Sequence, residues 1–95
     1  MRKKRDLEQM RRRVKTLQKQ LGELGPVMRG SVILIGARKQ ICFSLNKNKK
    51  TQLIYLGKKR EARAREYSAN YKKLREIVEE ITQLNMLLIK ENYEI

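Results

Sequence analysis

The sequence predicts an α+β fold, in which an antiparallel two-helix coiled-coil hairpin carries a small three-stranded antiparallel sheet between its helices, in the order α-β-β-β-α. Three observations predict it. Apolar residues repeat with a helical period over residues 3–24 and again over residues 58–92. Between these segments, residues 29–56 change to the short apolar runs and alternation typical of strands. At 95 residues, the chain is expected to form a single domain, residues 1–95.

The first predicted helix covers residues 3–24 and carries an apolar stripe with spacings of three and four. The stripe consists of Leu7, Met10, Val14, Leu17, Leu21 and Leu24. This spacing is that of the a and d positions of a coiled coil. Because an isolated helix of this length is marginal in water, the stripe needs a partner helix. Gly22, Gly25 and Pro26 are expected to end the helix.

Residues 29–56 are predicted to form three strands joined by short turns. Residues 31–35 are rich in β-branched side chains, Ile41, Phe43 and Leu45 alternate with Cys42 and Ser44, and residues 51–56 return as the third strand. Residues 46–50 predict a hairpin loop, because Asn tolerates left-handed backbone angles. Short connections favour antiparallel neighbours, so a meander is expected.

The second predicted helix covers residues 58–92 and matches the first in its apolar stripe. Its a and d positions hold Tyr67, Leu74, Ile77, Ile81, Leu84 and Leu88. Antiparallel packing of the two helices would place Leu7 near Leu88 and Val14 near Ile81.

The charge of the chain is large, positive and unevenly distributed. Lys and Arg number 24 against 10 Asp and Glu, which gives a net charge of +14. Residues 24–60, the acid-free segment, contain nine basic side chains and no acidic one. Such a segment repels itself unless it meets a polyanion, and phosphate backbones are the common one. We therefore expect nucleic acid as the partner, with DNA favoured over RNA, and a non-enzymatic, phosphate-binding mode with little reading of base sequence.

The expected nucleic-acid-binding residues are the basic side chains of the acid-free segment, one that follows it, and a basic stripe on the first helix. They are Arg29, Arg38, Lys39, Lys47, Lys49, Lys50, Lys58, Lys59, Arg60 and Arg63, with Lys4, Arg5, Arg11 and Arg12 on the first helix. Lys58, Lys59 and Arg60 oppose the dipole at the start of the second helix, which a bound phosphate would offset. The arginines of the first helix have a structural alternative, because Arg12 or Arg13 could pair with Glu79 or Glu80.

Two aromatic side chains of the predicted sheet also have two interpretations. Phe43 and Tyr55 could form a platform on which single-stranded bases stack. They could equally belong to the apolar core between the sheet and the helices.

The sequence lacks the residues that several classes of function require. The chain has no His and a single Cys, Cys42, so neither a disulfide within the chain nor a multi-cysteine metal cluster is expected. We expect no enzyme activity, no cofactor and no metal site. No apolar run approaches the roughly 20 residues that span a bilayer, so no membrane association and a cytoplasmic location are expected.

Four short motifs lie within residues 28–88: MRGSVI at 28–33, NKNKKTQLIYL at 46–56, NYKKL at 70–74 and EITQLN at 80–85. In these motifs, residues 28–88 resemble a family of small prokaryotic domains of unknown function. The resemblance implies an Arg-Gly-Ser strand, a lysine-rich hairpin and a terminal helix, and an accessory role in mobile or viral elements. Many relatives carry a cysteine-rich insertion between the first two strands. Residues 36–40 lack it here, so no metal site is carried over.

A second function is compatible with the same pattern. The chain could be an assembly or adaptor protein that forms a homodimer or binds a protein partner through its helices and its basic sheet. The helical stripe would then dock the partner, and the basic surface would meet an acidic face instead of phosphate. Met86, Leu87 and Leu88 are the side chains expected to remain free for such a contact.

Overall fold

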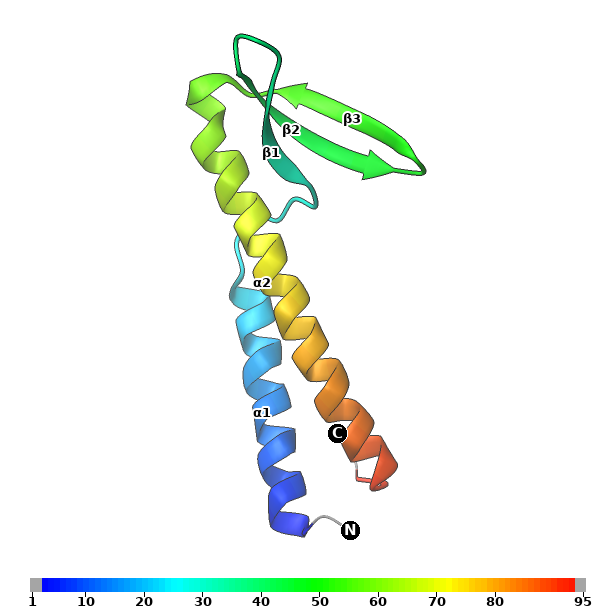
Figure 1. Ribbon diagram of the computed structural model, residues 1–95. Helices are drawn as coiled ribbons and strands as arrows, with labels where there is room; N and C mark the ends of the chain where they lie inside the picture. The colour runs from blue at the N-terminus through cyan, green and yellow to red at the C-terminus, as the bar shows by residue number, and fades with distance from the viewer. Residues whose placement is uncertain (1–2, 94–95) are drawn as a thin grey trace. The chain divides into compact units, whose positions relative to one another are not determined.

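The computed structural model describes residues 3–93 and has the predicted order of elements (Figure 1). The elements are α1 (Lys4–Glu23), β1 (Ser31–Ile35), β2 (Gln40–Lys47), β3 (Lys50–Tyr55) and α2 (Gly57–Lys90). The strands form one antiparallel sheet in the order β1-β2-β3, and the two helices contact each other. The predicted fold class is therefore confirmed.

The contacts divide the chain into two compact units. The helical unit contains the chain up to Leu24 and from Lys73 onward, and the sheet unit contains residues 25–72. α2 contributes its first half to the sheet unit and its second half to the helical unit.

The helical unit has the apolar contacts that the two stripes predict. Leu7, Val14 and Leu88 are buried in one cluster, against which Ile81 and Leu84 pack. The sequence predicts that Leu7 lies near Leu88, and Val14 near Ile81. All four belong to this one cluster, so the expected antiparallel packing is confirmed. Burial of these side chains stabilises helices that would be marginal alone.

An ion pair crosses the two helices. The Arg13 guanidinium donates two hydrogen bonds to the Glu80 carboxylate, Nε to Oε2 at 2.7 Å and a terminal nitrogen to Oε1 at 3.2 Å. Two parallel bonds between planar groups fix their relative orientation. The structural alternative for the first helix is therefore confirmed for Arg13, which pairs with Glu80.

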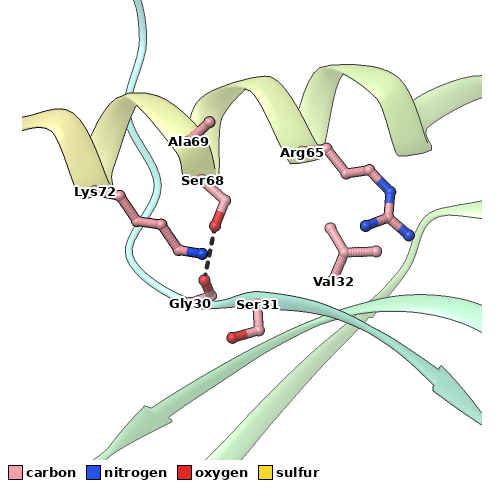
Figure 2. A pocket seen from close by; sticks show the side chains of 7 residues that line it. All are labelled: Gly30, Ser31, Val32, Arg65, Ser68, Ala69 and Lys72. Atoms are coloured by element: carbon pink, nitrogen blue, oxygen red, sulfur yellow. Dashed lines mark hydrogen bonds between the residues drawn. The ribbon is translucent and has the colours of Figure 1, made fainter.

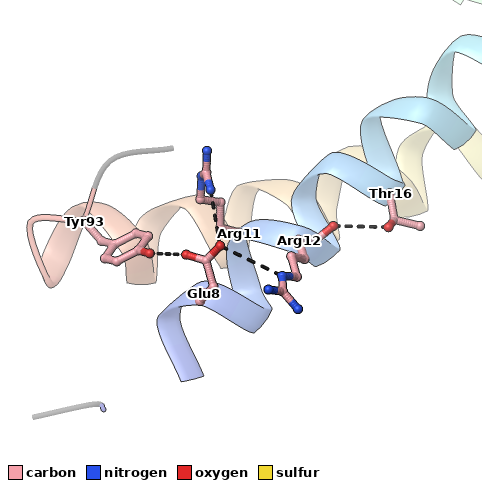
Figure 3. Close-up of polar contacts among 5 residues, drawn as sticks. All are labelled: Glu8, Arg11, Arg12, Thr16 and Tyr93. Atoms are coloured by element: carbon pink, nitrogen blue, oxygen red, sulfur yellow. Dashed lines mark hydrogen bonds and ion pairs between the residues drawn. The ribbon is translucent and has the colours of Figure 1, made fainter. Parts of the chain in front are cut away.

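α2 ends at Lys90, two residues before the predicted end, because Asn92 turns the backbone into the left-handed region at φ 57°. The N–H of Tyr93 then donates to the Leu88 carbonyl at 2.8 Å, and the N–H of Asn92 donates to the Ile89 carbonyl at 2.9 Å. These two bonds form a Schellman motif. The motif returns Tyr93 to the Leu88 cluster, where its hydroxyl donates to the Glu8 carboxylate on α1 (Figure 3).

The two faces of the sheet differ. Val32, Phe43 and Ile54 are paired across the strands and share one face, while Ile33, Cys42 and Tyr55 share the other. Phe43 packs against Ala64 of α2, so we call its side the helix-facing face.

The segment before β1 is fastened to α2 at three points. The Pro26 carbonyl accepts from Asn70 Nδ2 at 2.9 Å, the Met28 N–H donates to the Tyr67 carbonyl at 3.1 Å, and Ser68 Oγ donates to the Gly30 carbonyl at 2.9 Å. Gly30 has φ 143°, and a Cβ there would lie 2.5 Å from the Ser44 carbonyl oxygen and 2.7 Å from the Phe43 ring. Only glycine allows this approach.

Replacing Gly30 with Ala is expected to destabilise the sheet unit by about 1–3 kcal/mol, since the added methyl overpacks the contact with Phe43. Urea unfolding followed by circular dichroism measures the change. Gly22→Ala is the matched control. Gly22 does not end the first helix as predicted but lies within α1, with nothing within 4 Å of the added carbon. Equal stability of the two variants would contradict the close approach at Gly30.

The helical unit is expected to lose stability on both sides of neutral pH. The hydrogen bond from Tyr93, assisted by the charges of Arg11 and Arg12, lowers the pKa of Glu8, and the bond from Arg13 lowers the pKa of Glu80. The unfolded chain therefore binds more protons in acid, and stability falls as the pH drops below the ordinary value of 4.5. The bond to Glu8 raises the pKa of Tyr93, so stability also falls as the pH rises above 10.0.

Urea midpoints across pH measure this profile, and Tyr93→Phe is the informative variant. It should be less stable at neutral pH, less sensitive to acid and free of the loss of stability above pH 10.0 that Tyr93 contributes. An unchanged pH profile in Tyr93→Phe would exclude the Tyr93–Glu8 bond as its origin.

Candidate nucleic-acid interface

β2 separates the basic side chains near its two ends into two groups. The turn at 36–39 precedes this strand and the turn at 48–49 follows it. A strand of eight residues spans roughly 25 Å, so the two turns lie well apart. Arg38 and Lys39 belong to the first turn, and Lys47, Lys49 and Lys50 to the second.

The first group lines a pocket where the start of α2 meets the first turn. We call it the turn–helix pocket; it measures about 290 Å³ and is lined by Arg38, Lys39, Gln40, Ile41, Tyr55, Gly57 and Lys58. The pairing of Tyr55 with Cys42 brings the end of β3 beside the start of β2. Gly57, at φ 66°, then turns the chain into α2 and places Lys58 at the pocket. Three cations predicted from different parts of the sequence thus meet at one site.

Arg60 has a structural role at the same junction. Its Nε donates to the Leu56 carbonyl at 2.9 Å, and a terminal nitrogen donates to the Tyr55 carbonyl at 2.8 Å. These bonds hold the end of β3 against the first turn of α2, so Arg60 positions the turn–helix pocket. Lys59 and Arg63 are exposed on the same part of α2.

The second group, the hairpin cluster, consists of Arg29, Lys47, Lys49 and Lys50. Lys47 lies directly opposite Lys50 in the sheet, an unfavourable pairing of like charges. A terminal nitrogen of Arg29 donates to the Asn46 carbonyl at 3.0 Å, so its guanidinium lies at the same end of β2. Four cations therefore surround the tip of the β2–β3 hairpin.

The remaining predicted cations lie on α1, in the helical unit. Lys4, Arg5 and Arg12 are exposed, and Arg11 is partly buried. Arg11 and Arg12 both contact the Glu8 carboxylate, at 3.3 Å and 3.9 Å (Figure 3). Part of the charge of this stripe is thus balanced within the helix.

The two aromatic side chains are not equivalent. Phe43 is 4% exposed in the apolar cluster with Leu56 and Ala64, whereas Tyr55 is 58% exposed on the opposite face. Because the register places the two rings on opposite faces of the sheet, they cannot form a common stacking platform. The prediction that these rings belong to the core is confirmed for Phe43 and wrong for Tyr55. Tyr55 is free to stack as part of the turn–helix pocket.

A further basic site has no counterpart among the predicted residues. Arg65 and Lys72 extend from α2 toward the start of β1, and with Ser31 and Ser68 they line a crevice of about 260 Å³ (Figure 2). Arg65 Nε also donates to Glu61 at 2.7 Å. The sequence signal is the spacing of Arg65, Ser68 and Lys72, three and four residues apart, which places them on one helical face.

Comparison with models of protein families, with curated proteins and with solved structures gave no match. The resemblance to small prokaryotic domains stays a prediction. Within residues 3–93, no group of His, Cys, Asp and Glu side chains is arranged to hold a metal ion. Over the same range, neither helix has the combination of length and apolar character that a bilayer crossing requires.

Lys49 is expected to lower the stability of the hairpin that presents it. Asn48 and Lys49 form its two-residue turn with φ 53° and 64°, which is a type I′ turn that prefers glycine at the second position. Lys49→Gly should raise the free energy of unfolding by about 1 kcal/mol, because a side chain in left-handed backbone costs that much. Urea unfolding measures it, with Asn48→Gly as the control of smaller effect. A Lys49→Gly variant less stable than the original chain would contradict the backbone strain inferred at Lys49.

Proposed function

We propose that this protein binds nucleic acid in the cytoplasm, without catalysing a reaction, through phosphate contacts with little reading of base sequence. DNA is favoured over RNA, and an accessory role in a mobile or viral element follows from the family resemblance. The observation that carries the proposal is the turn–helix pocket, where Arg38, Lys39 and Lys58 converge beside the exposed ring of Tyr55.

The electrostatics of this pocket favour an anion. Residues 24–60 contain no acidic side chain. The first acid after them, Glu61, pairs with Arg65 at 2.7 Å, so its charge is already balanced by another arginine. Lys58 lies in the first turn of α2, where free backbone N–H groups and the helix dipole add positive potential. A phosphate bound there would satisfy the lysine and these backbone donors together. The exposed Tyr55 ring can stack on an adjoining sugar or base.

The backbone of both turns supports the same proposal. Lys39 and Lys49 have φ 49° and 64°, which a glycine would adopt with less strain. Each turn of the sheet therefore holds a lysine in the conformation that disfavours it. A requirement for positive charge at these positions accounts for both, and strained residues often mark functional sites.

Binding of duplex DNA is expected to depend steeply on salt. If roughly 6–10 phosphates are contacted, affinity should fall about 10³–10⁵-fold between about 50 and 200 mM salt, because bound counterions are released. Replacing Arg38, Lys39 and Lys58 with Ser should reduce the salt slope by about three, one for each lost phosphate contact. Fluorescence anisotropy measures both effects.

The matched control replaces Lys15, Arg75 and Lys90, which are exposed and lie outside all the predicted sites, with Ser and so removes the same charge. Its salt slope should stay close to that of the original chain. If the salt slope fell equally in the two triple variants, the change would come from the total charge of the protein and not from the turn–helix pocket. Salt-insensitive binding, or no binding at low salt, would overturn the proposed function.

The adaptor alternative is favoured by a separate observation on α2. Val78, Met86 and Ile89 are exposed large apolar side chains that share one helical face in the helical unit. The expectation that Leu88 is free for such a contact is wrong, because Leu88 is fully buried against α1. Self-association of nuclease-treated protein in sedimentation, without affinity for nucleic acid, would favour this alternative.

A further inference from the structure

We propose that an apolar pocket on the helix-facing face of the sheet receives one unpaired base of a single strand, while the hairpin cluster binds its phosphate. The pocket measures about 270 Å³ and is lined by Met28, Arg29, Phe43, Leu45, Gln52 and Ile54. This inference rests on the proposed function and assigns the form of nucleic acid that the hairpin cluster prefers.

The side chains on the helix-facing face of the hairpin change from apolar, through amide, to cationic toward its tip. On the helix-facing face, the paired residues are first Phe43 and Ile54, then Leu45 and Gln52, then Lys47 and Lys50. Successive pairs on one face are separated by roughly 7 Å. An apolar floor, one amide side chain and two cations therefore follow each other over roughly 14 Å along one face. A base bound at the apolar end would direct its sugar-phosphate chain toward the two lysines, whose long side chains extend the reach of the cationic end.

The cationic tip of the hairpin lies next to the pocket and is built for an anion; of its cations, Arg29 also lines the pocket. Lys47 and Lys50 face each other across the hairpin, and Arg29 reaches the same end, where the Asn46 carbonyl orients its guanidinium at 3.0 Å. Like charges that lie directly opposite in a sheet are destabilising. A phosphate between the two lysines reverses that repulsion, and the second edge of the Arg29 guanidinium can donate to it.

The apolar end of the pocket is open to a ligand. Ile54 is 57% exposed although it lies on the same face as the buried Phe43. At about 270 Å³ the pocket lies below the roughly 300–1,000 Å³ of sites for drug-sized molecules, so one flat ring system fits it better than a long chain.

The combination selects a nucleotide among anionic ligands. Base edges carry both hydrogen-bond donors and acceptors, which the Gln52 amide matches, whereas a lipid chain or an apolar peptide side chain leaves that amide without a use. A base within a duplex is stacked and paired, so only an unpaired base can enter. The apolar walls accept any base, which agrees with little reading of sequence.

The test compares three ligands of equal length by anisotropy at one salt concentration: single-stranded DNA, the same backbone with abasic sites throughout, and duplex DNA. The original chain should bind the single strand about 5–100-fold more tightly than the abasic strand, as stacking of one base provides. Ile54→Ser should remove this preference. Leu53→Ser is the matched control, because Leu53 is 52% exposed and adjacent in β3 but lies on the opposite face.

Each outcome is decisive. Equal affinity for the single and abasic strands overturns the base pocket and leaves the proposed function standing, while failure to bind any of the three overturns both. Equal losses in Ile54→Ser and Leu53→Ser, or stronger displacement by an acidic apolar peptide than by single-stranded DNA, also overturn the base pocket. Urea midpoints of both variants, expected to be alike, check that the sheet unit is folded. If the preference for the single strand over the abasic strand is lost in Ile54→Ser and kept in Leu53→Ser, the proposal is supported.

Discussion

The close approach of the Gly30 backbone to the Phe43 ring is the contact on which the sheet unit depends. It brings the start of β1 against β2 at a distance that any side chain would prevent. The hydrogen bonds of Met28 and Gly30 to α2 act on the same stretch, so helix, strand and preceding segment are held together by one short run of residues. Because Arg29 lies within this run, the packing of the core also decides where its guanidinium is placed.

The backbone of the sheet unit also holds like charges close together. Backbone pairing holds Lys47 opposite Lys50, and the junction fastened by Arg60 holds Lys58 beside the first turn. Neither arrangement would form from the side chains alone, because each is electrostatically unfavourable without an anion. The apolar contacts and backbone hydrogen bonds of the sheet unit therefore offset a repulsion that the basic side chains create. Folding without a ligand thus prepares the positive potential that a phosphate chain would use.

Much of the fold follows from periodicity, but the faces of the sheet depend on one residue of register. The sequence predicts the strands and the hairpin, with a loop over residues 46–50; the observed turn contains only Asn48 and Lys49. The longer loop would pair Leu45 with Thr51 and place Tyr55 on the face of Phe43, whereas the observed pairing of Leu45 with Gln52 moves Tyr55 to the other face. The helix-facing pocket and the exposure of Tyr55 both depend on this shift, and periodicity cannot determine it. Likewise, the crevice of Arg65 and Lys72 exists only once α2 packs beside β1.

The two properties proposed for the hairpin, phosphate binding and an apolar base pocket, would complement each other. Phosphate contacts supply affinity that depends on salt and is indifferent to sequence. An apolar wall adds a preference for unpaired bases without a preference among them, because every base offers a flat apolar face. Gln52 is the one wall side chain with both a donor and an acceptor, and a single amide can favour one base edge over another only weakly. The proposed arrangement would therefore distinguish single strands from duplexes far better than it would distinguish sequences, which is the selectivity expected of a protein that contacts many different nucleic acids.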